Sequence, residues 1–368
     1  MQYLLGVLLF VHGLIHLMGF VQAFKLAPMR GLTQAISPPV GVLWLLCALA
    51  LVAAGGLLLC RREAWWMVAL PAVLISQGLI IAAWGDAKFG TIPNVLILLA
   101  VLPNLLSVLP GGYRQRYQAA VREGLARTTV QPVVTEADLQ PLPDPVQRYL
   151  RYAGVVGKPR VQNVRAVFTG TFRNGLRSPW MHFRSQQVNF YDRYARFFLM
   201  DASLFGIPLQ GLHAFGEHGA TFQVKVANLL PVANAAGAQM DQGETVTLFN
   251  DLCLLAPAAL LDQEHIRWTP IDAHTVRAAF THRGITITAT LSFDDTGALT
   301  NFVSPDRYLT ADGNTYASYP WSTPVHAYKE VAGRHVPAEA ETIWQMPEGD
   351  FLYGRFRLEE IAYNVGRK

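Results

Sequence analysis

The sequence predicts an α+β membrane protein, in which a four-helix transmembrane bundle is followed by a curved antiparallel β-sheet domain, half-barrel or barrel-like, with a short helical lid. Three observations lead to this prediction. Only 15% of the 368 residues are charged, where soluble domains carry about 25%. Just seven charged side chains and four long apolar stretches lie in residues 1–110. Apolar and polar residues alternate with a period of two after residue 161.

Four stretches are apolar and long enough to cross a bilayer, because a hydrocarbon core of about 30 Å requires roughly 20 helical residues. They lie near 3–24, 41–60, 64–84 and 92–109. Met1–Leu5 carries no Lys or Arg, so the first stretch lacks the basic start of a cleaved signal peptide. We expect residues 1–110 to form a four-span transmembrane domain.

The basic residues near the spans predict the orientation of the chain. Four spans place the N-terminus, the loop with Arg61 and Arg62, and the C-terminal domain on one side. More Lys and Arg flank the membrane on that side than on the other, so the positive-inside rule favours a cytoplasmic C-terminal domain. Most of the net charge of +4 belongs to residues 1–110, which argues against a nucleic-acid partner.

Two histidines lie inside the first span. His12 and His16 are four residues apart and share one helix face, where they could bind a metal ion or a haem group. Alternatively, each neutral ring bonds to a neighbouring helix, and we favour this reading because two histidines are an incomplete site for most metals. The polar residues available for such bonds are Ser76, Gln77, Asn94 and Asn104. No cofactor is identified.

Residues 111–160 form a basic, proline-containing linker with short helices. We expect one helix near Gln118–Ala126, lying at the membrane surface with the neighbouring arginines near anionic headgroups. A second helix is predicted at Val146–Tyr152.

Residues 161–368 are predicted to form the antiparallel β domain. The clearest strand is Ile285–Phe293, in which one face is apolar and the other carries hydroxyl groups. Nine weaker strands are predicted at Val164–Phe172, Trp180–Phe190, Ala195–Met200, Thr221–Val226, Val276–Thr281, Ala298–Val303, Val325–Val331, Ala338–Met346 and Phe351–Leu358. Roughly ten twisted strands rarely stay in an open plane, so we expect a strongly curved or closed sheet.

A helical insert at residues 244–262 interrupts the strands. Its helix, Glu244–Leu255, should place Glu244, Thr247 and Asp251 on one face and Val246, Phe249 and Cys253 on the other. A single amphipathic helix beside a one-faced sheet suggests a lid over the concave face. This arrangement encloses an apolar cavity unless bulky side chains fill it.

No common catalytic motif occurs in the sequence, including the nucleophile elbow, the P-loop and the zinc-protease helix. We therefore predict ligand-binding rather than catalytic residues. They are Glu244, Thr247, Asn250, Asp251, Trp268 and Arg307. A carboxylate in the middle of a helix requires a partner, and we predict a buried pair of Asp251 with Arg307. Cys253 is predicted to be a core residue, since it shares the apolar face.

Several segments resemble a bacterial membrane-protein family known only as a domain of unknown function. They are His12–Phe20, Asp86–Ile92, Glu244–Cys253 and Ser304–Tyr308. No activity accompanies this resemblance. The soluble half is also similar in architecture to the lipoprotein-carrier half-barrels of the bacterial envelope, which are periplasmic and hold acyl chains between a curved sheet and a helical lid.

We expect a multi-pass protein of the bacterial inner membrane whose β domain binds or transfers a lipid or another hydrophobic ligand without covalent chemistry. Membrane lipid is the expected partner, and an apolar small molecule or a second membrane protein are the alternatives. Two other functions remain open. The chain could be a redox or metal- or haem-binding subunit that uses His12 and His16, or an enzyme that uses Asp251 and Glu244.

Overall fold

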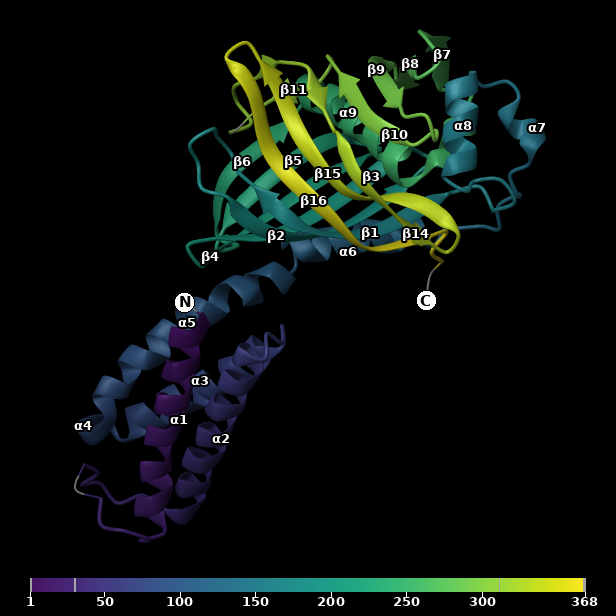
Figure 1. Cartoon of the computed structure of the whole chain (residues 1–368). Helices are drawn as coiled ribbons and strands as arrows, with labels where there is room; N and C mark the ends of the chain where they lie inside the picture. The colour runs from purple at the N-terminus through teal and green to yellow at the C-terminus, as the bar shows by residue number, and fades with distance from the viewer. Residues whose placement is uncertain (1, 30, 311, 367–368) are drawn as a thin grey trace. The chain divides into compact units, whose positions relative to one another are not determined.

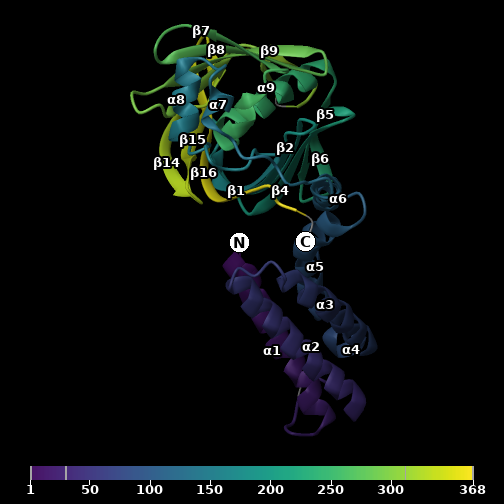
Figure 2. The same cartoon turned by 90° about the vertical axis from the view of Figure 1, so that its right-hand side faces the viewer.

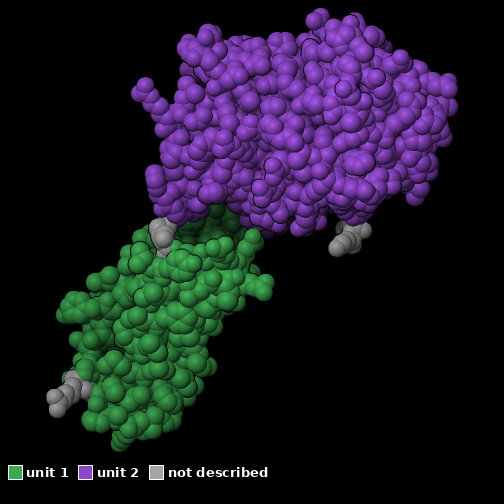
Figure 3. Space-filling view, viewed as in Figure 1, with its two compact units in different colours: residues 1–109, 227–229 green, residues 110–226, 230–368 purple. Residues whose placement is uncertain are grey.

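The structure of the chain, a computed structural model, describes residues 2–29, 31–310 and 312–366. It divides into two compact units, which Figure 3 shows in different colours. Residues 1–109 with 227–229 form one unit, and residues 110–226 with 230–368 form the other. Figure 1 labels the helices of the first unit and the strands of the second.

The first unit is helical. Its elements are α1 (Gln2–Ala23), α2 (Pro38–Leu59), α3 (Trp65–Ala82), α4 (Trp84–Ala87), η1 (Lys88–Gly90) and α5 (Thr91–Val108). Four of the described helices are long and apolar enough to cross a membrane, which confirms the four predicted stretches. Two consecutive prolines open α2, where the missing N–H groups cost no helical hydrogen bond.

The second unit is a curled antiparallel sheet with an inner helix. Four helices, one short 3₁₀ helix and sixteen strands are described in it. The helices are α6 (Tyr113–Leu125), α7 (Glu136–Leu139), α8 (Asp144–Tyr152), α9 (Ala238–Leu255) and η2 (Pro257–Leu261). The first strands are β1 (Asn163–Phe172), β2 (Met181–Phe190), β3 (Ala195–Leu204), β4 (Ile207–Gly216), β5 (Gly219–Val226) and β6 (Leu230–Ala236). The remaining strands are β7 (Ile266–Pro270), β8 (Thr275–His282), β9 (Ile285–Phe293), β10 (Leu299–Ser304), β11 (Tyr308–Leu309), β12 (Ala317–Ser318), β13 (Trp321–Ser322), β14 (Val325–Val331), β15 (Arg334–Met346) and β16 (Gly349–Tyr363).

The strand order explains how the sheet curls. It runs β6-β5-β4-β3-β2-β1-β16-β15-β13-β10-β9-β8-β7, with β14 paired to β15. The C-terminal strand β16 therefore lies between β1 and β15 and joins the two halves of the sheet. The edge strands β6 and β7 are connected by α9 and η2, and Figure 2 shows α9 within the curve of the sheet. The predicted half-barrel with an inner helix is confirmed.

Helix α6 packs on the outer face of the sheet. Tyr113 and Tyr117 lie in a small core with side chains of β2, β3 and β4. Gly124 permits this approach, since a Cβ atom there would lie 2.2 Å from the ring of Phe190. Arg114 also pairs with Asp201 of β3 at 2.8 Å. The aromatic side chains of one face of α6 therefore pack against the sheet. Its location at the membrane surface stays a prediction.

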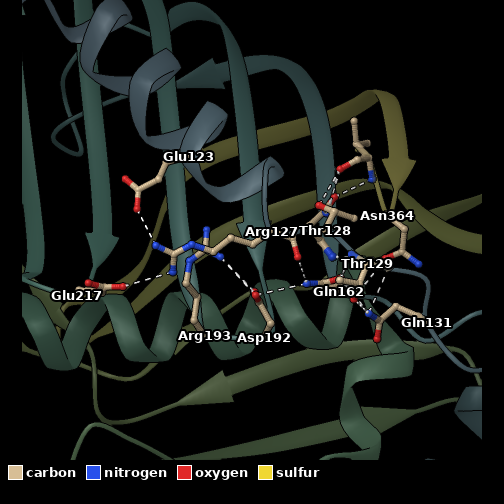
Figure 4. Close-up of polar contacts among 12 residues, drawn as sticks. Glu123, Arg127, Thr128, Thr129, Gln131, Gln162, Asp192, Arg193, Glu217 and Asn364 are labelled. Atoms are coloured by element: carbon tan, nitrogen blue, oxygen red, sulfur yellow. Dashed lines mark hydrogen bonds and ion pairs between the residues drawn. The ribbon is translucent and has the colours of Figure 1, made fainter. Parts of the chain in front are cut away.

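Polar contacts attach the segment after α6 to the β domain (Figure 4). The backbone N–H of Thr129 donates to Gln162 Oε1 at 2.8 Å, and the backbone N–H of Gln162 donates to Asn364 Oδ1 at 2.7 Å. Thr128 Oγ1 donates to the carbonyl of Val365 at 3.1 Å. The linker is therefore held against the start of β1 and the end of β16.

One half of the concave face is filled by the hydrophobic core. Phe249 of α9 stacks on Phe280 of β8 with ring centroids 5.0 Å apart, and Phe302 of β10 packs beside it. Tyr149 of α8 is fully buried and donates from its hydroxyl to the carbonyl of Cys253 at 2.6 Å. Aromatic pairs of this kind add to the free energy gained from burial. This half therefore holds α9 firmly in place.

Candidate functional site

The other half of the concave face holds a partly open cavity of about 380 Å³. The cavity lies between α9 and strands of the first half of the sheet, together with β15 and β16. Most of its wall is apolar. The apolar lining includes Phe168, Phe172, Met181, Phe198, Met200, Leu209, Phe222, Val224, Leu254, Leu255, Trp321, Trp344, Phe351, Phe356 and Leu358. The expected cavity is present, because these bulky side chains line the space and leave its centre open.

Helix α9 supplies one polar wall of the cavity. It begins at Ala238, six residues before the predicted start, and Gly237 precedes it with a φ of 97°, a backbone conformation that suits glycine. Glu244, Thr247 and Asp251 line the cavity together, while the opposite face of the helix lies in the core. The predicted division of the helix into two faces is confirmed.

A buried ion-pair network crosses from α9 to β3. Arg196 Nε lies 2.7 Å from Asp251 Oδ2, and Arg196 Nη1 lies 3.1 Å from Glu244 Oε2. Our prediction that Asp251 pairs with Arg307 is therefore wrong. Arg196 takes that position because the curl of the sheet brings β3 under the polar face of α9, next to both carboxylates.

Two amides of β2 complete the surroundings of Asp251. Its Oδ2 atom accepts hydrogen bonds from Gln187 Nε2 at 2.6 Å and from Asn189 Nδ2 at 3.1 Å. Together with Arg196, three donors converge on one carboxylate oxygen. Buried charges are tolerated when they are paired and hydrogen-bonded in this way.

The network controls the protonation of Glu244 and His213. Burial by itself raises the pKa of Glu244, but the charge of Arg196 and the hydrogen bond from His213 lower it to about 2. Burial lowers the pKa of His213, although its Nδ1 lies 3.0 Å from Glu244 Oε1 and the carboxylate opposes the shift. We therefore describe this contact as a hydrogen bond from a neutral ring. A carboxylate with such a low pKa is a poor general acid or base near neutral pH.

Arg307 lies elsewhere on the cavity wall. Its Nε donates to Thr247 Oγ1 at 3.1 Å, and its Nη1 donates to the Tyr353 hydroxyl at 3.0 Å. Its guanidinium carbon lies 4.3 Å from the ring centroid of Trp321 and 5.2 Å from that of Trp344. Arg307 is thus held by neutral groups and by aromatic rings.

The structure brings five of the six predicted ligand-binding residues to the cavity. Asn250 is among them, and its Nδ2 donates to Thr323 Oγ1 at 2.6 Å. Trp268 is the exception. It lies on β7, half-buried, beside a separate hollow lined by Pro141 and Pro143. We therefore no longer place Trp268 in the site.

Cys253 is a core residue, as predicted. It is fully buried, and burial raises the pKa of its thiol well above the usual value. A buried thiol in apolar surroundings is a weak nucleophile. Among the described residues, no three His, Cys, Asp or Glu side chains gather in a way that could hold a metal ion.

Three polar residues of the cavity wall were not predicted from the sequence: Arg196, His213 and Tyr353. They lie on β3, β4 and β16. The signal in the sequence is on β2, where Gln187 and Asn189 alternate with Val188 and Phe190. The structure buries both amides. Buried amides on alternate positions indicate a polar patch on the concave face.

The two histidines of α1 form a separate polar cluster in the first unit. His12 Nε2 donates to Asn94 Oδ1 at 2.8 Å, and His16 Nδ1 donates to the carbonyl of His12 at 2.9 Å. Ser76 Oγ also donates to Asn94 Oδ1, at 3.0 Å. Bonds to neighbouring helices are thus present for His12. A metal bound here would have to use His12 Nδ1 and His16 Nε2, which have no hydrogen-bond partner among the described residues.

The fold and the site define a protein with a curled antiparallel sheet around a partly open, mostly apolar cavity whose wall contains a buried charge network. Residues 132–356, more than half of the chain, match a family of unknown function, DUF6544. The chain belongs to this family. The resemblance to a family known only as a domain of unknown function is thereby confirmed.

Three solved structures are similar to the chain. A protein described as an outer membrane lipoprotein-sorting domain, from Vibrio parahaemolyticus, is 9% identical, with 56% of this chain and 87% of that chain covered and a TM-score of 0.33. A DUF1329 family protein from Desulfovibrio piger is 11% identical, with 64% and 95% covered and a TM-score of 0.35. A LolA superfamily protein from Nitrosomonas europaea is 10% identical, with 59% and 93% covered and a TM-score of 0.33. No curated protein matches the sequence.

Proposed function

We propose that the β domain binds or transfers a lipid or another hydrophobic ligand in the cavity beneath α9, without covalent chemistry. One observation carries the proposal: a cavity of about 380 Å³ with mostly aromatic and aliphatic walls lies inside the domain. Sites for small apolar ligands are typically concave and apolar, with a few well-placed polar groups that orient the ligand. Binding would bury the apolar surface of the ligand and release water from the cavity wall.

The polar groups of the cavity favour binding over catalysis. Glu244 and Asp251 are both paired with Arg196, and the low pKa of Glu244 removes it as a proton donor near neutral pH. Cys253 is buried away from the cavity in the core. An enzyme that uses Asp251 and Glu244 is therefore the less favoured alternative.

We further infer that the four apolar helices anchor the chain as a multi-pass protein of the bacterial inner membrane, with the β domain on the cytoplasmic side. The length and composition of α1, α2, α3 and α5 and the distribution of Lys and Arg support this inference. A reporter fused to the C-terminus should be active as a cytoplasmic enzyme. Activity of a periplasmic reporter would reverse the orientation.

Native mass spectrometry of the full-length protein in mild detergent tests the ligand directly. We expect a co-purified lipid or, after delipidation, uptake of a fluorescent fatty acid. Gly211 lines the cavity on β4, where an added Cβ would make only ordinary contacts, so Gly211→Leu should weaken uptake by partly filling the cavity. Gly216→Leu on the same strand lies outside the cavity lining and is the matched control.

One outcome would contradict the proposed function, and another would contradict the location of the site. If neither lipid nor fatty acid binds to the wild-type protein, the proposed function is wrong. If Gly211→Leu and Gly216→Leu take up the probe equally well, the ligand binds somewhere other than in this cavity.

A further inference from the structure

We propose that Arg307 is the receptor for an anionic headgroup, so that the ligand of this cavity is an amphiphile with an apolar chain and a terminal carboxylate or phosphate. This inference rests on the proposed function and deepens it, because it names the chemical class of the ligand.

Arg307 has no carboxylate partner within the described part of the chain. The two carboxylates on α9 that face the cavity both pair with Arg196: Asp251 at 2.7 Å and Glu244 at 3.1 Å. Two further acidic side chains of the lining belong to β15 and pair with arginines of β16. Among the described residues, no ion pair involves Arg307, whereas Arg196, which also lines the cavity, has two.

The hydrogen bonds of Arg307 leave one nitrogen free. Nε and Nη1 donate to Thr247 Oγ1 and to the Tyr353 hydroxyl. Nη2 makes no hydrogen bond to any residue that the structure describes, and Arg307 lines the cavity. A guanidinium has five N–H donors in a planar fork that matches a carboxylate or a phosphate. The donors of Nη2 therefore remain available to a ligand in the cavity.

Tyr353 offers a second donor at the same place. Its hydroxyl oxygen accepts hydrogen bonds from Arg307 Nη1 and from Trp321 Nε1, both at 3.0 Å. These two bonds occupy the lone pairs of the oxygen, so the hydroxyl proton is left to donate. Tyr353 also lines the cavity. An anion next to Arg307 would thus receive hydrogen bonds from a charged and a neutral group.

The position of the guanidinium is well defined. The rings of Trp321 and Trp344 lie 4.3 Å and 5.2 Å from its carbon, and both tryptophans are almost fully buried. Cation–π contacts of this kind hold a guanidinium without neutralising it. The charge of Arg307 acts on Glu244, but no carboxylate of the described residues contacts its guanidinium. An anionic ligand at Nη2 would therefore add a direct, charge-assisted hydrogen bond that the protein does not supply. The apolar wall around it then accommodates the chain of the amphiphile.

Three eight-carbon probes test this inference on the full-length protein in lipid nanodiscs. We would titrate octanoate, octyl phosphate and 1-octanol at neutral pH and measure binding by calorimetry. The wild-type protein should bind at least one of the two anions at least about tenfold more tightly than 1-octanol, as expected for a charge-assisted hydrogen bond. A preference for octanoate identifies a carboxylate ligand, and a preference for octyl phosphate identifies a phosphate ligand.

Variants locate the preference. Arg307→Met retains an apolar stem without the charge and should bind the anions and 1-octanol equally. Tyr353→Phe removes one donor and should weaken anion binding severalfold without changing the affinity for 1-octanol, which gives a second readout if Arg307→Met fails to fold. Arg277→Met, the same substitution at an exposed position of β8 outside the cavity, should retain the wild-type preference.

Two results would overturn the inference in different ways. If the wild-type protein binds 1-octanol as tightly as both anions, and Arg307→Met changes neither affinity, then Arg307 is not an anion receptor, while the proposed binding function stands. If none of the three probes binds to the wild-type protein, then the proposed function fails and the inference fails with it.

Discussion

Replacing Arg196 with Met should destabilise the β domain strongly. Arg196 is buried and is the cation that contacts both Glu244 and Asp251, so Arg196→Met leaves two carboxylates in the interior without an ion-pair partner. Removing one partner of a buried ion pair costs about 3–5 kcal/mol. For a domain of this size, that loss corresponds to a decrease in Tm of roughly 6–20 °C.

Chemical unfolding of the full-length protein, followed by tryptophan fluorescence, measures this loss. Arg357→Met is the matched control, because Arg357 pairs with Glu339 at 3.1 Å and both side chains are exposed. Surface pairs of this kind contribute little to stability. We expect Arg357→Met to unfold close to the wild-type midpoint.

A rescue experiment tests the reasoning further. Adding Glu244→Gln and Asp251→Asn to Arg196→Met removes the unpaired charges and should restore much of the lost stability. A loss of less than about 1 kcal/mol for Arg196→Met alone would refute the argument, since a buried charge without a partner costs more than this. Absence of any rescue would show that packing of the arginine side chain, and not its charge, stabilises the domain.

Folding lowers the pKa of His213 below its ordinary value of 6.5 and that of Glu244 from 4.5 to about 2. Each shift therefore stabilises the fold fully at a pH above the pKa of the unfolded chain, 6.5 for His213 and 4.5 for Glu244. This stabilisation is lost as the pH falls towards the pKa of the folded protein. Tm should therefore decrease as the pH falls below about 6.5 and again below about 4.5, and a flat profile from pH 7 to pH 3 would contradict this. The buried thiol of Cys253 should react with an alkylating reagent only after unfolding, as mass spectrometry can show. Because His12 Nε2 is bonded to Asn94, we expect no Soret band from the purified protein, and a Soret band would restore the redox alternative.

Strands and helices with one buried face and one face in solvent could be predicted from the sequence. The strand Ile285–Phe293 has the predicted bounds, and its apolar residues Ile287, Ala289 and Leu291 are buried. By contrast, β4 and β6 were not predicted. Strand β4 packs against α6 on its outer face and lines the cavity on its inner face, so the alternation of polar and apolar residues is weakened. A period-two pattern disappears when both faces of a strand are covered.

The candidate site was predictable only in part, for a similar reason. The polar face of α9 follows from the helical period, which places Glu244, Thr247 and Asp251 together. Neither the helical nor the strand periodicity of the sequence predicts which residue pairs with Asp251. Arg196 lies 55 residues away in the sequence, and its contact depends on how far the sheet curls around the helix.

The sequence by itself determined the four apolar helices, most strands of the β domain and the two faces of α9, because each depends on residues a few positions apart in the chain. Only the tertiary structure decided that β16 joins the two halves of the sheet, that Arg196 pairs with both carboxylates and that no acidic side chain among the described residues contacts Arg307. The physical reason is the range of the interactions. Helical and strand periods report which side of an element is buried, whereas strand pairing and charge pairing depend on segments that meet only when the chain folds.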